Sequence, residues 1–434
     1  MKNFTFKQNT KFIPLVLCLL IYQITKAQDQ EFVRQQYTPA EPACVYYADN
    51  YRGAHSTFRS QAVANNMSRG SACSSFIVTY NGFTPEAEAA FQFAVDIWAN
   101  SIESSQPIRI NANFAPLNAG VLGQAGPTNF FTSNAPGALP DVFYPIALWE
   151  KLEDRDSEDP PPFGNSDSVD ISCTFSSTFN FYFGTDANPP NGQFDFVSIV
   201  LHELGHGLGF VGLASSDGSE GTIRVGNPPR PSVYSNFIEN GSNTSILGFD
   251  DPSMALQNQL TGNNLFCNGP QAVAENGGDE PKIFAPNPYN GGSSYSHWDE
   301  STFLAGDINS LMTPQIGPGE ANHNPGPITL GFFEDMGWSL CASLSTEEFE
   351  VADLNINPNP FSDRVFITIN NGNSGVYNLD LFDINGRLIK SSGATTTDGR
   401  LMMSNLQDLE RALYFIKVTE MDTGLSITKK IVKN

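Results

Sequence analysis

The sequence predicts a mixed α/β (α+β) domain followed by a small all-β sandwich, and three patterns support this fold class. Residues 196–210 place apolar side chains with helical periodicity, whereas residues 365–369 and 414–418 alternate apolar and polar side chains as strands do. A polar, acidic stretch at residues 342–354 separates the two regions and is typical of a linker. The 434 residues suffice for domains that each bury a core of their own.

The N-terminal residues have the arrangement of a cleaved signal peptide. Three lysines precede an apolar run at residues 12–22, and a small-residue ending follows at Ala27. The run is too short to span a bilayer, which takes about 20 apolar residues, and no later stretch comes close. We therefore expect residues 1–27 to be a signal peptide, the protein to be exported, and no transmembrane segment to follow.

The formal net charge of −23 makes the chain strongly acidic. Such a balance keeps a protein soluble and repels phosphate backbones, so it argues against nucleic acid and anionic membrane surfaces as partners. The 37 glycines and 29 prolines predict many turns and long loops between the regular elements.

Residues 28–74 show no sustained periodicity and are rich in Gln, Asn, Ser and Ala. We expect a loosely packed N-terminal arm or a propeptide here. Regular structure begins at residues 75–80, which predict a short strand. Thr84 then reads as an N-cap with Pro85 at the first helical position, so a helix should run to about Ile102.

Two further strands are expected before the most strongly patterned helix of the chain. Residues 108–114 alternate apolar and polar side chains and should return beside the first strand. Residues 154–168 are acidic and contain prolines, which predicts a surface loop, and residues 169–175 form the next strand.

The helix at residues 196–210 contains the pattern His202-Glu203-Leu204-Gly205-His206. The two histidines are four residues apart, so they lie one turn above each other, on a face away from the apolar stripe. Two imidazole nitrogens so placed can bind one tetrahedral ion at about 2.0–2.1 Å. A carboxylate at Glu203 can accept a proton from water and pass it to a leaving amine, which is the chemistry of peptide hydrolysis.

A catalytic zinc needs three protein ligands and an open position, so a third ligand must be found. Gly209 satisfies the glycine of the extended pattern HExxHxxGxxH, but Gly212 stands where that pattern has its last histidine. The third ligand must therefore be remote. The remaining histidines are His55, His297 and His323.

His297 is one candidate, and Met312 follows it fifteen residues later in a Leu-Met-Thr-Pro turn that could lie beneath the metal; the family resemblance carried by these residues favours it as the third ligand. His323 is its rival, although its loop suits a hydrogen-bonding or surface role. A glutamate such as Glu239 or Glu275 could serve instead, but neither lies in a convincing helical second motif.

These residues resemble the core of the leishmanolysin-like metzincins over residues 75–341. The resemblance is carried by Gly209, by Ser296-His297-Trp298, by Leu311-Met312 and by Asp335-Met336-Gly337-Trp338. It implies a metzincin-like zinc metallopeptidase domain in which His202, His206 and His297 hold one Zn²⁺, Glu203 is the general base, and Met312 supports the site. The chain differs from eukaryotic members in its few cysteines, so their disulfide pattern and substrate range do not transfer.

The C-terminal region, residues 355–434, has the strand spacing of a small β-sandwich. Asn357-Pro358-Asn359-Pro360-Phe361, the segment 381–387 and the lysine-rich end at 414–433 resemble the type A sorting domain of the type IX secretion system. The resemblance implies contact with that secretion machinery, passage across the outer membrane, and release or attachment at the cell surface.

Five cysteines follow the predicted signal peptide and contain no CxxC pair: Cys44, Cys73, Cys173, Cys267 and Cys341. In an oxidising compartment we expect up to two disulfides and one remaining thiol, with the pairing left open. Cys44 or Cys73 could instead cap the metal as a thiolate, although a structural disulfide is favoured.

A calcium site is considered at Asp186, Asn188 and Asp195, but their spacing matches no known calcium loop, so solvated turn residues are favoured. The sequence as a whole predicts a secreted zinc-dependent endopeptidase acting on proteins or peptides. The main alternative is a catalytically inactive surface adhesin or binding protein on a metalloprotease scaffold, against which the intact Glu203 argues. A zinc hydrolase for a non-peptide bond is the third possibility.

Overall fold

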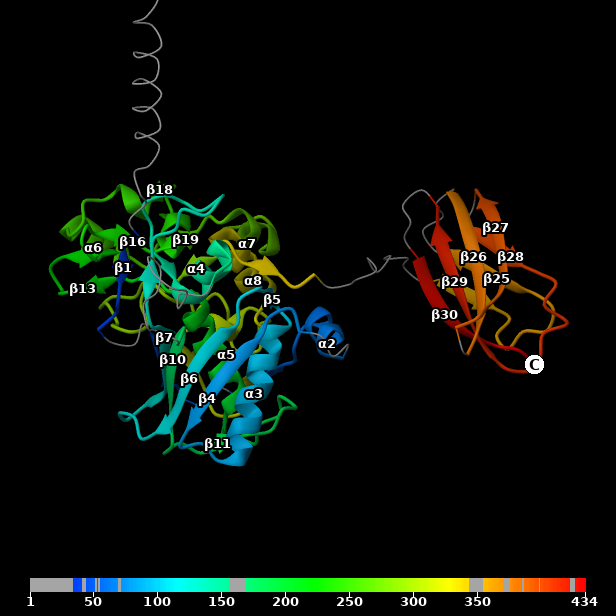
Figure 1. The fold of residues 1–434 in the computed structure, drawn as a ribbon, viewed down its shortest axis with the longest axis horizontal. Helices are drawn as coiled ribbons and strands as arrows, with labels where there is room; N and C mark the ends of the chain where they lie inside the picture. The colour runs from blue at the N-terminus through cyan, green and yellow to red at the C-terminus, as the bar shows by residue number, and fades with distance from the viewer. Residues whose placement is uncertain are drawn as a thin grey trace, which may run out of the picture. The chain divides into compact units, whose positions relative to one another are not determined.

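The computed structural model describes most of the chain as two compact units, Met1–Cys341 and Ala342–Asn434, each considered by itself (Figure 1). The described residues are 34–40, 44–50, 53, 55–68, 72–155, 169–342, 354–369, 375–384, 386–397, 399–421 and 426–434. The predicted signal peptide, residues 156–168 of the predicted acidic loop and residues 343–353 of the predicted linker lie outside them.

A six-stranded sheet forms the centre of the first unit (Figure 1). The strands lie in the order β21 (Gln315–Ile316), β2 (Cys44–Ala48), β7 (Val121–Pro127), β10 (Ile171–Ser176), β6 (Ile108–Ala115) and β4 (Phe76–Asn81). Strands β4 and β10 run parallel to β6, whereas β7 is antiparallel to both β10 and β2. Strand β6 carries the predicted alternation, with Ile108, Ile110 and Ala112 buried. The three strands expected near residues 75–80, 108–114 and 169–175 are thus confirmed.

Helix α3 (Pro85–Ala99) begins as predicted. The Thr84 hydroxyl accepts a hydrogen bond from the Ala87 N–H, and Pro85 occupies the first turn, where its missing N–H costs nothing. The helix ends at Ala99, three residues before the expected end, because the chain turns at Asn100 into strand β5 (Ile102–Glu103).

Helix α5 (Phe196–Leu208) is buried along its whole length and packs against α3, β7 and β10. Asp195 is its N-cap, and its side chain accepts a hydrogen bond from the Ser198 N–H. Gly209 ends the helix at a φ of 126°, a conformation that favours glycine. The Trp98 indole N–H donates to the Leu201 carbonyl at 2.9 Å and so fixes α5 against α3.

The remaining elements of the first unit are short. Its other helices are α2 (Gln61–Ser68), α4 (Ile146–Glu153), α6 (Met254–Leu260), α7 (Pro270–Glu275) and α8 (Pro327–Met336), with 3₁₀ turns η1 (Val233–Phe237), η2 (Ile246–Gly248) and η3 (Ser310–Met312). Its other strands are β1 (Gln36–Tyr37), β3 (His55–Thr57), β8 (Phe130–Phe131), β9 (Tyr144–Pro145), β11 (Phe181–Tyr182), β12 (Phe194–Asp195), β13 (Ser215–Ser216), β14 (Gly221–Thr222), β15 (Arg224–Val225), β16 (Arg230–Pro231), β17 (Ile238–Asn240), β18 (Thr244–Ser245), β19 (Leu265–Cys267), β20 (Lys282–Ile283), β22 (Glu320–Asn322) and β23 (Ser339–Leu340).

We expected residues 28–74 to form a loosely packed arm, and this expectation is wrong for the segment Cys44–Ala48. This segment is strand β2 of the central sheet, where it pairs with β7 on one side and β21 on the other. Cys44 is 0% and Tyr46 2% exposed. The five-residue strand is too short to produce a visible period in a polar stretch, and its partners lie far along the chain. Removal of this region as a propeptide stays a prediction.

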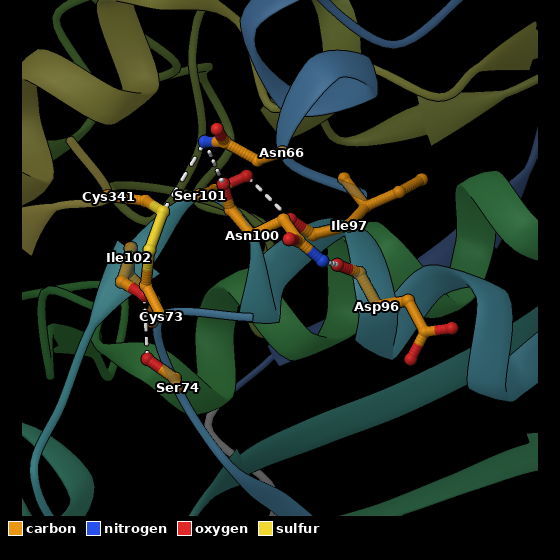
Figure 2. Close-up of a disulfide and its surroundings, with 9 residues drawn as sticks. All are labelled: Asn66, Cys73, Ser74, Asp96, Ile97, Asn100, Ser101, Ile102 and Cys341. Atoms are coloured by element: carbon orange, nitrogen blue, oxygen red, sulfur yellow. Dashed lines mark hydrogen bonds between the residues drawn. A yellow bond between two sulfur atoms is a disulfide. The ribbon is translucent and has the colours of Figure 1, made fainter. Parts of the chain in front are cut away.

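Among the described residues one disulfide forms, Cys73–Cys341, which joins two positions 268 residues apart in the sequence (Figure 2). Both cysteines are held by backbone hydrogen bonds, from the Cys73 N–H to the Ala99 carbonyl and from the Cys341 N–H to the Ser101 carbonyl. The other three described cysteines, Cys44, Cys173 and Cys267, are buried free thiols. The second disulfide that the sequence allowed is therefore not formed among them.

Replacing both Cys73 and Cys341 by Ser is expected to lower the free energy of unfolding by about 2–5 kcal/mol, because the unfolded chain regains the entropy of a long loop. Thermal unfolding with and without reductant measures this. The control Cys267→Ala removes a thiol that forms no disulfide and should respond to reductant as the wild type does. A double variant as stable as the oxidised wild type would contradict the expectation.

The second unit is the predicted all-β region. Side chains that alternate along its strands, such as Val365 and Ile367 or Tyr414 and Ile416, point into one shared apolar core. A three-stranded sheet, β24-β25-β28, and a four-stranded sheet, β27-β26-β29-β30, enclose this core. The bounds are β24 (Leu354–Asn357), β25 (Val365–Ile369), β26 (Gly375–Asp383), β27 (Leu388–Thr396), β28 (Arg400–Met403), β29 (Leu413–Glu420) and β30 (Ser426–Val432).

Among the described residues, no helix is both long and apolar enough to cross a membrane.

Candidate metal centre

Three histidine rings meet beside helix α5. His202 and His206 lie one turn apart on that helix, and their Nε2 atoms are 3.0 Å apart. The Nε2 atom of His297 lies 3.2 Å from each of them. All three side chains are buried. The structure thus brings together the helical pair and the favoured remote histidine of the sequence analysis.

The Nδ1 atoms of these rings show how the rings are oriented. Each Nδ1 lies close to a backbone carbonyl, that of Leu311 for His202 at 2.6 Å, of Phe210 for His206 at 2.7 Å, and of Ser293 for His297 at 2.6 Å. A carbonyl only accepts, so Nδ1 must carry the proton. In a neutral ring the Nε2 lone pair is then free to bind an ion.

Burial favours the neutral form of all three rings. It lowers the pKa of His202 and of His206 well below the usual range, and the neighbouring rings lower both further. Burial also lowers the pKa of His297 to about 4. Neutral imidazoles with converging lone pairs repel one another unless a cation lies between them, so this arrangement fits a metal ion.

The histidines are buried although they lie away from the apolar stripe of their helix. The loop that carries His297 and the turn that carries Met312 cover this face from the other half of the chain. A β-carbon added to Gly205 would lie 2.8 Å from the Met312 sulfur, so the methionine lies directly against the helix between the two histidines.

Gly212 explains why the extended helical pattern lacks its last histidine. A β-carbon at this position would lie 2.1 Å from the Tyr295 ring, which leaves no room for a side chain. The Gly212 N–H donates to the Ser296 hydroxyl at 3.1 Å. Gly212, which stands where the extended pattern has its last histidine, therefore binds the loop that supplies His297.

Glu203 is buried on α5 and faces strand β7, where a β-carbon added to Gly123 would lie 3.3 Å from its Cγ. Burial raises the pKa of its carboxyl well above the usual range, while the backbone N–H groups of Tyr46 and Ala125 oppose this rise. Neither carboxyl oxygen makes a hydrogen bond of normal geometry to the described part of the chain. A buried carboxyl of this kind is suited to carry a proton.

The rival histidine, His323, lies in a different cluster. Its Nε2 is 2.8 Å from an oxygen of Asp195, the N-cap of α5, and that same oxygen accepts from the Ser198 hydroxyl at 2.7 Å. His323 therefore helps to fix the start of the helix. His55 lies exposed in β3, Glu239 in β17 and Glu275 in α7, all outside the group of three histidines.

The three residues considered for calcium are engaged separately. Asp186 accepts hydrogen bonds from the Tyr182 hydroxyl and from the Asn188 backbone, whereas Asp195 is bonded to Ser198 and His323. They form no common group of ligands within the described residues.

A fourth residue joins the three histidines. The Cys44 Sγ lies 3.5 Å from the His297 Nε2, and the ligand atoms of Cys44, His202, His206 and His297 all lie within 4.8 Å of one another. Among the described residues this group could hold a metal ion. The sequence favoured a disulfide for Cys44, whereas the structure has it as a free thiol beside the histidines. The alternative that the sequence also allowed, a thiolate cap on the metal, agrees with this position.

Two family models match parts of the chain. Residues 355–434 match the secretion system C-terminal sorting domain, and residues 66–219 match a family described as SPBPB7E8-like. No curated protein matches the sequence.

Two solved structures overlap a fifth of the chain or less. One is PorZ of Porphyromonas gingivalis, an essential bacterial surface component of the type-IX secretion system, at 17% identity over 20% of this chain and 12% of its own, with a TM-score of 0.17. The other is dimeric latent PorU of Porphyromonas gingivalis, at 18% identity over 19% of this chain and 9% of its own, with a TM-score of 0.16. This chain thus spans only a small part of either.

The sorting domain directs the chain to the cell surface or exterior, and it implies an interaction with the secretion machinery. This confirms the localisation expected from the sequence. Ahead of that domain lies a mixed α/β region with a candidate metal site of three histidines and one cysteine.

Proposed function

We propose that this chain is a secreted zinc-dependent endopeptidase, in which His202, His206 and His297 hold one zinc ion and Glu203 is the general base. The observation that carries the proposal is the convergence of three Nε2 atoms within 3.2 Å of one another. Two ligands at about 2.1 Å from a tetrahedral ion lie about 3.4 Å apart, which is close to this spacing. Imidazole ligands also suit zinc better than magnesium or calcium.

The bound zinc would supply a Lewis acid that polarises a carbonyl group and makes water more acidic. The chain's own residues then transfer the proton. Glu203 accepts a proton from the attacking water and delivers it to the leaving amine. Its buried carboxyl, with a raised pKa, holds that proton more readily than an exposed glutamate does.

Several contacts support the metzincin-like part of the proposal. Gly209 ends the metal-binding helix at a positive φ, and Met312 lies against that helix at Gly205. The Trp298 N–H donates to the Met312 carbonyl at 2.9 Å, so the histidine loop and the methionine turn are joined. The Trp338 indole donates to the Leu208 carbonyl at 3.0 Å and joins the last motif to the same helix.

Cys44 favours a second candidate function, a closed metal site without catalysis. Structural zinc sites have four protein ligands, whereas catalytic ones keep one position open. A permanently bound Cys44 would suit the adhesin or binding protein considered from the sequence. The intact, buried Glu203 argues against it, because a closed structural site has no use for a proton carrier.

Metal removal tests the proposal. The secreted chain, before and after limited proteolysis of its N-terminal region, should contain about one zinc per chain and cleave casein in one of these forms. A zinc chelator should abolish cleavage, and added Zn²⁺ but not Ca²⁺ should restore it. If the chain contains zinc but neither form cleaves casein or peptide libraries, the result would support the binding-protein function instead.

A further inference from the structure

A cavity of about 640 Å³ lies beside the candidate metal centre. Two residues that line it, Ser294 and Ser296, closely precede His297 in the chain, and a third, Val211, follows soon after the end of α5. Pockets that enclose a whole small molecule typically have volumes of about 300–1,000 Å³. The cavity is therefore large enough for such a ligand.

Among the described residues, no charged side chain lines this cavity. Charged residues make up 16% of the chain, so a wall of this size would ordinarily contain some of them. A charged ligand that lost its water here would meet no opposite charge, and its burial would therefore be costly. The cavity selects an uncharged ligand.

Three serines of the wall offer hydroxyl hydrogens to a ligand. Ser216, Ser294 and Ser296 each accept a hydrogen bond from a backbone N–H, at 3.0, 2.8 and 3.1 Å respectively. A hydroxyl that accepts in this way keeps its own hydrogen for donation. The backbone contacts thus hold three donors in place at the cavity.

Helix α6 supplies acceptors to the same cavity. The Oε1 atom of Gln257 is buried, and no group in the described part of the chain donates a hydrogen bond to it. The Thr261 hydroxyl donates to the Gln257 backbone carbonyl at 2.9 Å, so its oxygen can still accept. A buried acceptor without a partner is costly, and a ligand that donates to Gln257 removes this cost.

The wall also has an apolar and aromatic part. Val211, Leu213 and Val225 belong to one small hydrophobic cluster. Tyr289 lines the cavity as well, and its hydroxyl donates to the Ala214 carbonyl at 2.8 Å, which fixes the ring. The cavity thus combines apolar surface, an aromatic ring, hydroxyl groups and an amide.

We propose that this cavity is a binding site for a neutral sugar unit. A pyranose ring carries hydroxyl groups around its rim, each able to donate and to accept, and C–H groups on its faces. The serine hydroxyls and the Gln257 amide bind the rim. Tyr289 packs against a face, because an aromatic ring supplies a large apolar area in a fixed orientation. This binding goes beyond the proposed peptidase function and does not depend on it.

The first test measures binding to the full secreted chain by calorimetry and saturation-transfer NMR. The probes are the methyl glycosides of galactose, mannose, N-acetylgalactosamine and N-acetylglucosamine, with N-acetylneuraminic acid as a charged control. We expect at least one neutral probe to bind with a dissociation constant of about 1 mM, as is usual for a ligand of this size, and the charged control not to bind. If no neutral probe binds, or if the charged control binds more tightly than all of them, the proposal is overturned.

Two pairs of variants locate the binding in this cavity. Gln257→Leu keeps the size of the side chain and loses its amide, so the affinity should fall about 3–10-fold. Gln259→Leu is its control, because Gln259 is on the same helix and outside the cavity wall. Tyr289→Leu should also weaken binding, whereas Tyr289→Phe keeps the ring and should retain most of the affinity.

Thermal unfolding shows first that each variant is folded. Ser216→Ala, a smaller change in strand β13, replaces any variant that is not. Affinity that neither Gln257→Leu nor Tyr289→Leu lowers would place the sugar elsewhere on the chain and overturn the proposal.

A sugar attached to a protein and a free polysaccharide present the same chemistry, and a further comparison distinguishes them. The probes are a threonine peptide that carries one N-acetylgalactosamine, the same peptide without the sugar, and a soluble neutral galactan. Tightest binding of the glycopeptide assigns the site to glycoproteins, and tightest binding of the galactan assigns it to polysaccharides; either result supports the sugar site.

Equal binding of the bare peptide and the glycopeptide, both weakened by Tyr289→Leu, would identify an ordinary side-chain pocket and overturn the proposal. None of these measurements uses peptide cleavage. Failure of the peptidase function would therefore leave the sugar site standing, and failure of the sugar site would leave the peptidase function standing.

Discussion

Replacement of Glu203 by Gln is expected to lower kcat for peptide hydrolysis by about 10²–10⁴-fold, the usual contribution of general acid–base catalysis. Gln has nearly the same size and cannot accept a proton, so the site keeps its shape and loses its proton carrier. The side chain does not belong to the group of three histidines and one cysteine. The zinc content should therefore remain that of the wild type.

The measurement compares casein cleavage and zinc content in the two proteins after release of the N-terminal segment. Glu239→Gln is the matched control, because Glu239 is also largely buried but bonds to Asn268, away from the histidines. It should keep both activity and zinc. A Glu203→Gln protein that cleaves at the wild-type rate would exclude this residue as the base.

Replacement of His297 by Ala is expected to remove both zinc and activity. Loss of a residue that merely orients a metal ligand costs about 10–100-fold in affinity, and loss of a ligand itself should cost more. His297 comes from a loop rather than from α5, so the variant leaves the helical pair and Glu203 unchanged. Zinc content after dialysis and the zinc dissociation constant measure the effect.

His323→Ala is the control for this variant. Its imidazole lies against Asp195 at the start of α5, so its loss should lower the free energy of unfolding by about 1–3 kcal/mol, because the buried carboxylate loses one of its hydrogen-bond partners. It should leave the zinc content unchanged. If His323→Ala lost the metal while His297→Ala kept it, the ligand assignment would be wrong.

The sequence predicted correctly those helix ends and strands that depend on interactions between residues close together in the chain. The cap at Thr84, the glycine stop at Gly209 and the alternation from Val365 to Ile369 depend on neighbours within a few residues, and all three appear in the structure. The helical spacing of His202 and His206 belongs to the same class, because a four-residue separation alone places two side chains on one face.

Long-range pairing accounts for what the sequence did not predict. Cys44 and His297 are 253 residues apart, and Cys73 and Cys341 are 268 apart. No periodicity links such positions, because the sheet register that joins them is set by tertiary packing. The burial of the histidine face has the same origin, since the covering residues His297 and Met312 follow His206 by 91 residues or more along the chain.

The most direct test of a three-histidine zinc site is anomalous diffraction at the zinc absorption edge from crystals of the secreted protein. We expect one strong peak at about 2.1 Å from the Nε2 atoms of His202, His206 and His297. Crystals grown with zinc that show no peak among these three rings, or a peak beside Asp195 and His323 instead, would contradict it.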